Sequence, residues 1–283
     1  PLRGGQPHPL YATYSLILAT FLGTMGLPHV LVRFYTNPDG RTARRTALAV
    51  LCLLGAFYLF PAVYGALGRI YAPDLLLTGR TDAVVLELPQ RLVPGTGGQL
   101  LGMLVTAGAF AAFLSTSSGL AVSVTGVLSQ DLVRRRLGGI TGFRASAVVA
   151  VATPVALAFA AERLSVASVV GLAFAVAAST FCPLLVLGIW WRRLTHIGAI
   201  AGLVAGGTLA GAAVVATLIA DHDGWTAALL GQPAAWTVPI AFAVMIVVSL
   251  LSARHTPPDV ARTMVRLHAP EQLDLDRGGS RPG

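Results

Sequence analysis

Charged side chains are scarce in this sequence. Only 11% of its 283 residues are charged and 55% are hydrophobic, whereas a soluble domain carries about 25% charged residues. Lysine is absent, so all 20 basic residues are arginines, and the formal net charge is +8. So few charges cannot cover the surface of a water-soluble globule of this size, and the composition therefore predicts a protein embedded in a lipid bilayer.

The positive net charge would also suit nucleic-acid binding, but the sequence lacks a basic face with interleaved aromatic residues. The arginines lie instead in short gaps between apolar runs, where positive charge sets the orientation of membrane helices.

Residues for covalent or hydrolytic chemistry are equally few. The two cysteines, Cys52 and Cys182, lie inside apolar runs and are interpreted as small hydrophobic residues rather than as a disulfide or metal pair. The six histidines are scattered, and no carboxylate pair lies within an apolar run. The sequence therefore predicts that the protein is not an enzyme and holds no cofactor. The lack of intramembrane carboxylates also disfavours a proton relay.

Long apolar runs, in contrast, are abundant. Seven stretches approach the roughly 20 residues needed to cross a bilayer, and only helices satisfy every backbone polar group within one such stretch. The sequence predicts an all-α membrane protein with one transmembrane region over residues 1–253 and a poorly ordered tail over 254–283. The seven spans are expected near residues 11–34, 46–70, 100–128, 145–161, 166–191, 197–220 and 234–251. A short amphipathic helix is expected at 82–92, in the longest gap.

Arginine-rich gaps alternate with mixed or acidic gaps along the chain. The basic gaps follow the first, third, fifth and seventh spans (Arg33–Arg45, Arg134–Arg144, Arg192–Arg193 and Arg254). The gaps between them also hold acidic residues. By the positive-inside rule, the N-terminus is expected outside and the tail in the cytoplasm of a multi-pass cell-membrane protein.

The first span is interrupted about midway by the segment Gly23–His29, which contains two glycines and Pro28. Proline removes a backbone donor from a helix, and a broken membrane helix is tolerated only where its polar groups line a cavity. Transporters bind substrate at such breaks. Two interpretations are open: a substrate site, or a structural kink in a bundle helix. His29 could bind substrate or hydrogen-bond a neighbouring helix.

The third span carries four consecutive hydroxyl residues, Ser115–Ser118. Small hard cations require several oxygen ligands. Hydroxyls together with a backbone carbonyl three residues earlier would supply about half of a Na⁺ shell from one helix face. The alternative is close packing of small residues, with each hydroxyl bonded back to its own helix.

A second small-residue span, Gly171–Pro183, ends at a proline. It could flank a substrate pathway through Phe174 or Ser179. Each of these residues taken singly is also explained by plain helix packing.

At these three places the sequence resembles the sodium:solute symporter family, and within it the acetate/cation symporters. The segment GLPHVLVRFYT is similar to core helix six of that family. The segment AFAAFLSTSSGLAVSVTGVLSQDL is similar to core helix eight, and GLAFAVAASTFCPLL followed by WWRRLT to core helix ten. The similarity runs from about Tyr11 to Leu251, with the motifs in order and on the expected membrane sides.

The resemblance implies the inverted-repeat fold of LeuT-type transporters, with the first five spans as the second repeat and the last two as peripheral helices. It implies Na⁺ as coupling ion, bound by the carbonyl of Ala112 and the hydroxyls of Ser115 and Thr116. The interrupted helix makes Met25, Gly26 and His29 candidates for substrate binding.

One departure from the family is that nothing corresponds to its first repeat. The expected partners are therefore a small organic anion, the bilayer, and a missing N-terminal repeat supplied in cis or by a companion chain. The lack of an initiator methionine favours a fragment of a longer protein.

Together these features predict cation-coupled symport of a small monocarboxylate such as acetate. The alternatives are a membrane sensor or an inactive partial transporter of the same fold, and proline or another small organic solute as substrate.

Overall fold

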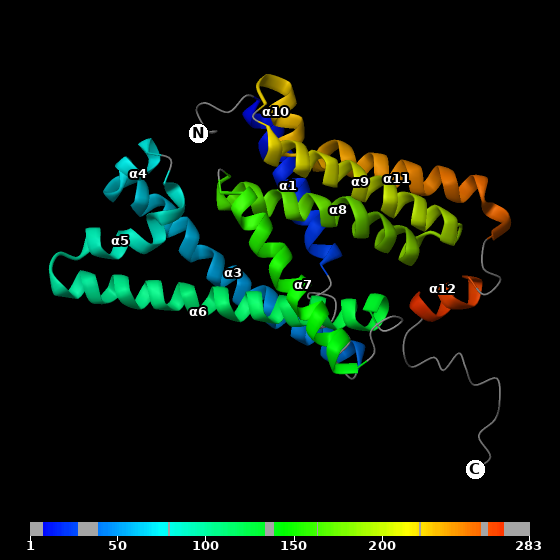
Figure 1. Ribbon diagram of the computed structural model, residues 1–283, viewed down its shortest axis with the longest axis horizontal. Coiled ribbons are helices and arrows are strands. Elements are labelled where there is room, and N and C mark those ends of the chain that lie inside the picture. The colour runs from blue at the N-terminus through cyan, green and yellow to red at the C-terminus, as the bar shows by residue number, and fades with distance from the viewer. Residues whose placement is uncertain are drawn as a thin grey trace, which may run out of the picture. The chain divides into compact units, whose positions relative to one another are not determined.

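The computed structural model describes residues 8–27, 39–78, 80–133, 139–162, 164–220, 222–255 and 260–268, and every regular element within them is a helix (Figure 1). The chain divides into two compact units. One is formed by residues 1–36 and 166–283, and the other by residues 37–165.

The first unit is a helical bundle with α8 at its centre. It contains α1 (Pro9–Gly26), α8 (Val166–Trp190), α9 (His196–Ile219), α10 (Gly224–Gly231), α11 (Ala234–Leu251), η3 (Ala253–His255) and α12 (Val260–His268). Helix α8 contacts α1, α9 and α11. Its buried core is built largely from small residues, Ala19, Ala175, Ala178, Ala234 and Val238. Small side chains let helix backbones approach closely, which is how membrane helices associate without help from the hydrophobic effect.

Glycines of α9 bring three of these helices together. Gly198, Gly202 and Gly206 are buried on one face of α9. A Cβ atom added to Gly202 would lie 2.5 Å from a methyl carbon of Met245 on α11. One added to Gly206 would lie 2.8 Å from the carbonyl carbon of Ser179 on α8. Any larger residue at Gly206 therefore overlaps the backbone of a neighbouring helix.

The second unit begins with α3 (Gly40–Tyr71) and continues through α4 (Pro73–Leu77), η1 (Thr81–Ala83), α5 (Val84–Leu92), α6 (Thr96–Val127), η2 (Leu128–Val133) and α7 (Gly139–Ala160). Asp39 caps α3 by accepting a hydrogen bond of 2.6 Å from the backbone N–H of Thr42. Gly95 has a φ of +84°, which glycine adopts without strain and which turns the chain into α6. Helix α5 packs against α3 and α6, and α6 packs against α7.

A charged cluster joins α4 to α5 in this unit. The guanidinium of Arg91 donates to both carboxylate oxygens of Asp74, the longer bond being 2.8 Å, and to Glu87 at 2.7 Å. The hydrogen bonds from Arg91 hold the pKa of Asp74 below its usual value, and the same bonds raise the pKa of Arg91. These groups mark a hydrated end of the unit, because ionised side chains avoid the bilayer interior.

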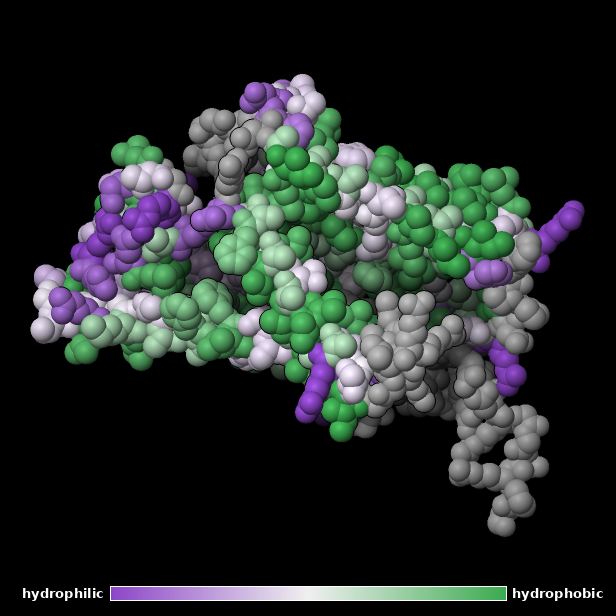
Figure 2. Space-filling view, in the orientation of Figure 1, coloured by the Kyte–Doolittle hydropathy of each residue, from purple (hydrophilic) through white to green (hydrophobic). Residues whose placement is uncertain are grey.

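The all-α membrane class is confirmed. Within the described residues, six helices are long and apolar enough to span a membrane: α3, α6, α7, α8, α9 and α11. Each overlaps one predicted span. The ends of α8, α9 and α11 agree within one residue, whereas α3, α6 and α7 begin four to six residues before the predicted spans. The first predicted span, 11–34, corresponds to α1, and its last part, residues 28–34, lies outside the described residues. Hydrophobic residues cover much of the visible surface (Figure 2), which suits contact with lipid.

The amphipathic helix expected at 82–92 is confirmed, as η1 and α5. The tail was expected to have little order, but it contains helix α12, whose Met264 is buried.

Candidate functional site

The predicted cation-binding face lies on α6. Ser115 and Thr116 follow Ala112 by three and four residues, so the three residues share one side of the helix. All three are exposed. The hydroxyl of Ser117 donates to the Phe113 carbonyl at 2.6 Å, and that of Ser118 donates to the Ser115 carbonyl at 3.1 Å.

The hydroxyl run is therefore split in two. Ser117 and Ser118 hold their oxygens against their own helix, as in the packing interpretation. In the described part of the chain, the Ser115 and Thr116 side chains form no hydrogen bond. With the Ala112 carbonyl they offer three uncharged oxygens on one face, which is the donor type that hard cations prefer. Clusters of three or more His, Cys, Asp or Glu that could hold a metal are absent from the described residues.

The glycines near the break in the first span pack α1 against α8. A Cβ added to Gly23 would overlap the carbonyl oxygen of Phe174. One added to Gly26 would lie 2.9 Å from the carbonyl oxygen of Ala177 and 2.9 Å from the Cβ of Phe181. This contact explains both glycines by close helix packing and places Phe174, which is half-buried, beside α1.

Helix α1 ends at Gly26, in the middle of the predicted span. The last four carbonyls of a helix lack partners within that helix, so this end is a polar point in an apolar segment. Met25 is 37% exposed beside it. Carbonyl groups suit a cation or a hydrogen-bond donor, whereas an anion requires N–H groups. His29, the other candidate at the break, lies outside the described residues.

Ser179 is fully buried between α8 and α11. Its hydroxyl lies 2.7 Å from the Ala175 carbonyl and 2.6 Å from the hydroxyl of Thr237. Thr237 in turn lies 2.9 Å from the Pro233 carbonyl. These three contacts share only two hydroxyl hydrogens, so Ser179 has no donor left for a solute.

The predicted substrate residues Met25, Gly26, Phe174 and Ser179 all belong to the first unit, whereas Ala112, Ser115 and Thr116 belong to the second. Within the first unit, Gly26 and Phe174 lie in the same interface between α1 and α8. Thus the structure groups the substrate candidates of the first unit around α8 and keeps the three cation candidates on one face of α6.

Two polar contacts were not predicted from the sequence. One is the Ser179–Thr237 pair. The other is Ser15, whose buried hydroxyl donates to the Gln232 carbonyl at 2.6 Å and accepts from the Ala235 N–H at 3.1 Å, at the start of α11. The sequence offers one signal for both: a hydroxyl residue in an apolar span needs a hydrogen-bond partner.

The chain is similar to known membrane symporters. A protein-family model for the sodium:solute symporter family matches residues 7–206. The protein named "Uncharacterized symporter YwcA" from Bacillus subtilis is 35% identical over 202 residues, covering 69% of this chain and 39% of that protein. A "Monocarboxylic acid transporter" from Corynebacterium glutamicum is 32% identical over 272 residues, covering 88% of this chain and 48% of the transporter.

A further uncharacterized symporter, from Cupriavidus necator, is 29% identical over 297 residues, covering 86% of this chain and 42% of that protein. The chain thus spans between about two-fifths and one-half of the length of these relatives. No solved structure matches it significantly. Since the family model covers residues 7–206, and relatives named as a symporter and a transporter are 35% and 32% identical to the chain, the chain belongs to the sodium:solute symporter family.

Proposed function

We propose that this chain takes part in Na⁺-coupled symport of a small monocarboxylate, such as acetate, across the cell membrane. The observation that carries this proposal is the similarity to the Corynebacterium glutamicum monocarboxylic acid transporter, which extends over 88% of the chain. Family membership supports solute symport in general, and the substrate class comes from this relative.

The proposed fold is the second inverted repeat of a LeuT-type transporter with two additional peripheral helices, seven spans in all. In this arrangement the N-terminus faces outside and the tail faces the cytoplasm. The alternation of arginine-rich and acidic gaps supports the orientation. The proposed partner is the N-terminal repeat, supplied in the same polypeptide or by a companion chain.

The proposed Na⁺ ligands are the carbonyl of Ala112 and the hydroxyls of Ser115 and Thr116. Three oxygens are fewer than a cation shell requires, so the remaining ligands come from outside this face. Na⁺ at Ser115 and Thr116 would stabilise the outward-open state that accepts substrate, and rocking of the helices would then expose both sites to the cytoplasm.

The proposed substrate contacts are at the break in the first span. Met25, Gly26 and His29 would line one side of the path, and Phe174 the other. Because the carbonyl end at Gly26 offers no donor, the substrate carboxylate would take its hydrogen bonds from other groups along the path. Ser179 would contribute by holding α8 against α11, since its hydroxyl is already bonded within the protein.

Uptake of labelled acetate into proteoliposomes tests the proposal. The preparation contains the chain and, where its gene continues upstream, the longer product. A Na⁺ gradient should drive uptake, whereas choline replacing Na⁺, or a pH gradient alone, should not. Unlabelled propionate should compete and unlabelled proline should not. Competition by proline alone would reject the substrate class, and uptake driven by a pH gradient without Na⁺ would reject the coupling ion.

A further inference from the structure

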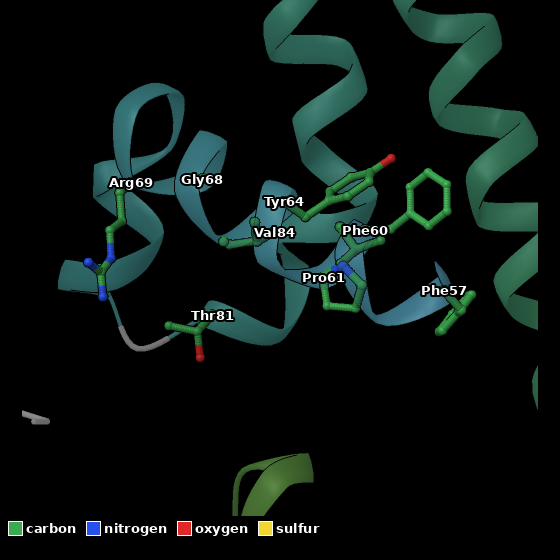
Figure 3. A pocket seen from close by; sticks show the side chains of 10 residues that line it. Phe57, Phe60, Pro61, Tyr64, Gly68, Arg69, Thr81 and Val84 are labelled. Carbon is green, nitrogen blue, oxygen red and sulfur yellow. The ribbon is translucent and has the colours of Figure 1, made fainter. Parts of the chain in front are cut away.

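An open cavity of about 560 Å³ lies within the second unit, between α3, η1 and α5 (Figure 3). We call it the α3–α5 groove. Its lining residues are Phe57, Phe60, Pro61, Tyr64, Gly65, Gly68, Arg69, Thr81, Val84 and Val85. The volume falls within the range of about 300–1,000 Å³ that is typical of small-ligand sites.

The groove has a polar end and an apolar end. Arg69 and Thr81 lie toward one end, while the rings of Phe57, Phe60 and Tyr64 lie along the rest (Figure 3). Within the described residues, the Arg69 guanidinium has no ion pair or hydrogen bond, whereas Arg80 lies 3.7 Å from Glu87 and Arg91 is paired twice. The polar end therefore presents a guanidinium that forms no ion pair with a described carboxylate.

The groove follows the last turns of a helix that is long and apolar enough to span a membrane. Arg69 lies in the last turn of α3, and the charged cluster around Asp74 follows directly after the helix. A long basic side chain near the end of a membrane helix extends toward the lipid headgroups. The aromatic part of the groove then lies at the depth of the acyl chains, and Arg69 lies at the depth of the phosphates.

We propose that the α3–α5 groove binds an anionic phospholipid, with the lipid phosphate at Arg69 and one acyl chain along Phe57, Phe60 and Tyr64. A guanidinium is well suited to phosphate because it offers several donors in a fixed plane. The hydroxyl of Thr81 provides a further donor at the same end. This site is independent of the proposed transport activity, since neither the Na⁺ face nor the substrate candidates contribute to it.

Native mass spectrometry of the purified chain, titrated with phosphatidylglycerol or phosphatidylcholine, tests whether the charge of Arg69 contributes to lipid binding. Arg69→Gln should weaken phosphatidylglycerol binding about fivefold, the effect of one basic residue on an anionic lipid, and leave phosphatidylcholine binding unchanged. The matched control Arg80→Gln removes a charge from the same unit but not from the groove, and it should leave both unchanged. Equal losses of phosphatidylglycerol binding in the two variants would show that the effect comes from net charge alone, and would overturn the proposed site.

A second pair of variants tests the acyl-chain part. Gly65 and Gly55 both lie on α3, and an added Cβ meets nothing within 4 Å at either position. Only Gly65 lines the groove. Gly65→Leu should therefore lower binding of both lipids, and Gly55→Leu should not. Unchanged binding in Gly65→Leu would overturn the proposal. Displacement of phosphatidylglycerol by oleate at equal concentration would also overturn it, because the groove would then bind carboxylate amphiphiles. Loss of lipid binding when further protein covers α3 would overturn it as well.

Discussion

Replacing single hydroxyl residues of α6 tests the proposed Na⁺ site directly. The perturbation is Ser115→Ala or Thr116→Val, each of which removes one ligand oxygen from the face shared with the Ala112 carbonyl. Ser117→Ala is the matched control because it lies in the same run, but its oxygen is held by the Phe113 carbonyl at 2.6 Å.

The magnitude follows from the contact that is lost. A hydrogen-bond-like contact to a charged group contributes about 1.5–3 kcal/mol, and each 1.4 kcal/mol changes an equilibrium constant about tenfold. The Na⁺ concentration for half-maximal uptake should therefore rise about 10- to 150-fold in Ser115→Ala and Thr116→Val. In Ser117→Ala it should stay within about threefold, because only a contact within the helix is lost.

The assay is the initial rate of labelled acetate uptake as a function of Na⁺, at saturating acetate and constant ionic strength. Immunoblots of the proteoliposomes establish equal amounts of protein. If all three variants show the same half-saturating Na⁺ concentration as the unsubstituted protein, the face does not bind Na⁺. If Ser117→Ala shifts as strongly as the other two, the run acts through helix packing instead.

Three stability predictions use thermal unfolding in detergent, followed by far-ultraviolet circular dichroism, which reports on the helices of both units. Gly206→Ala should destabilise the protein by up to about 2 kcal/mol, because overpacking costs about 1–3 kcal/mol and the gain in helix propensity offsets about 1 kcal/mol of it. In the control Gly211→Ala an added Cβ meets nothing within 4 Å, so this variant should be stabilised by up to about 1 kcal/mol. Equal shifts of the unfolding midpoint in the two variants would contradict the close packing of α9 at Gly206. Ser15→Ala should cost about 1 kcal/mol, because the Ala235 N–H at the start of α11 loses its acceptor, whereas the Gln232 carbonyl keeps the Tyr11 hydroxyl at 3.0 Å; an unchanged midpoint would refute this. Since Arg91 lowers the pKa of Asp74 in the folded protein, the ion pair should contribute fully to stability above the usual carboxyl pKa, and this contribution should be lost as the pH falls through the lowered pKa. Asp74→Asn should remove that part of the decrease in stability at low pH. An identical decrease in both proteins would contradict the prediction.

The membrane helices could be predicted well from the sequence, because the bilayer leaves the backbone few alternatives. The span expected at 234–251 is helix α11 with the same ends. The span expected at 46–70 is shorter than α3, which begins at Gly40. The difference arises because the Asp39 cap starts the helix in water, before the apolar run, and hydropathy does not detect a polar first turn. The interruption at Gly26 was detectable because glycine and proline disrupt an apolar run.

The side-chain partners could not be predicted in the same way. Gly26 contacts Ala177 on α8, and Ser179 bonds Thr237 on α11. These pairs are far apart in the sequence, so local composition carries no information about them. The hydroxyl run of α6 was visible in the sequence, but which two of its four oxygens bond back to the helix depends on side-chain rotamers. The helix register alone leaves that choice open.

The two units differ in how well they cover their own spans, and this bears on the cation face. In the most apolar stretches, 44% of α8 and 33% of α11 are buried, compared with 6% of α6 and none of α3. Apolar residues on α3 and α6 can face lipid at no cost. Two hydroxyls without hydrogen-bond partners cannot, because an unsatisfied polar group in hydrocarbon is costly. As they are placed, the Ser115 and Thr116 hydroxyls are suited to a polar neighbour such as an ion or water, whereas the adjacent exposed side chains of Phe113 and Leu114 are suited to lipid. The exposed surface of α6 therefore presents both side chains suited to lipid and two hydroxyls suited to a polar neighbour.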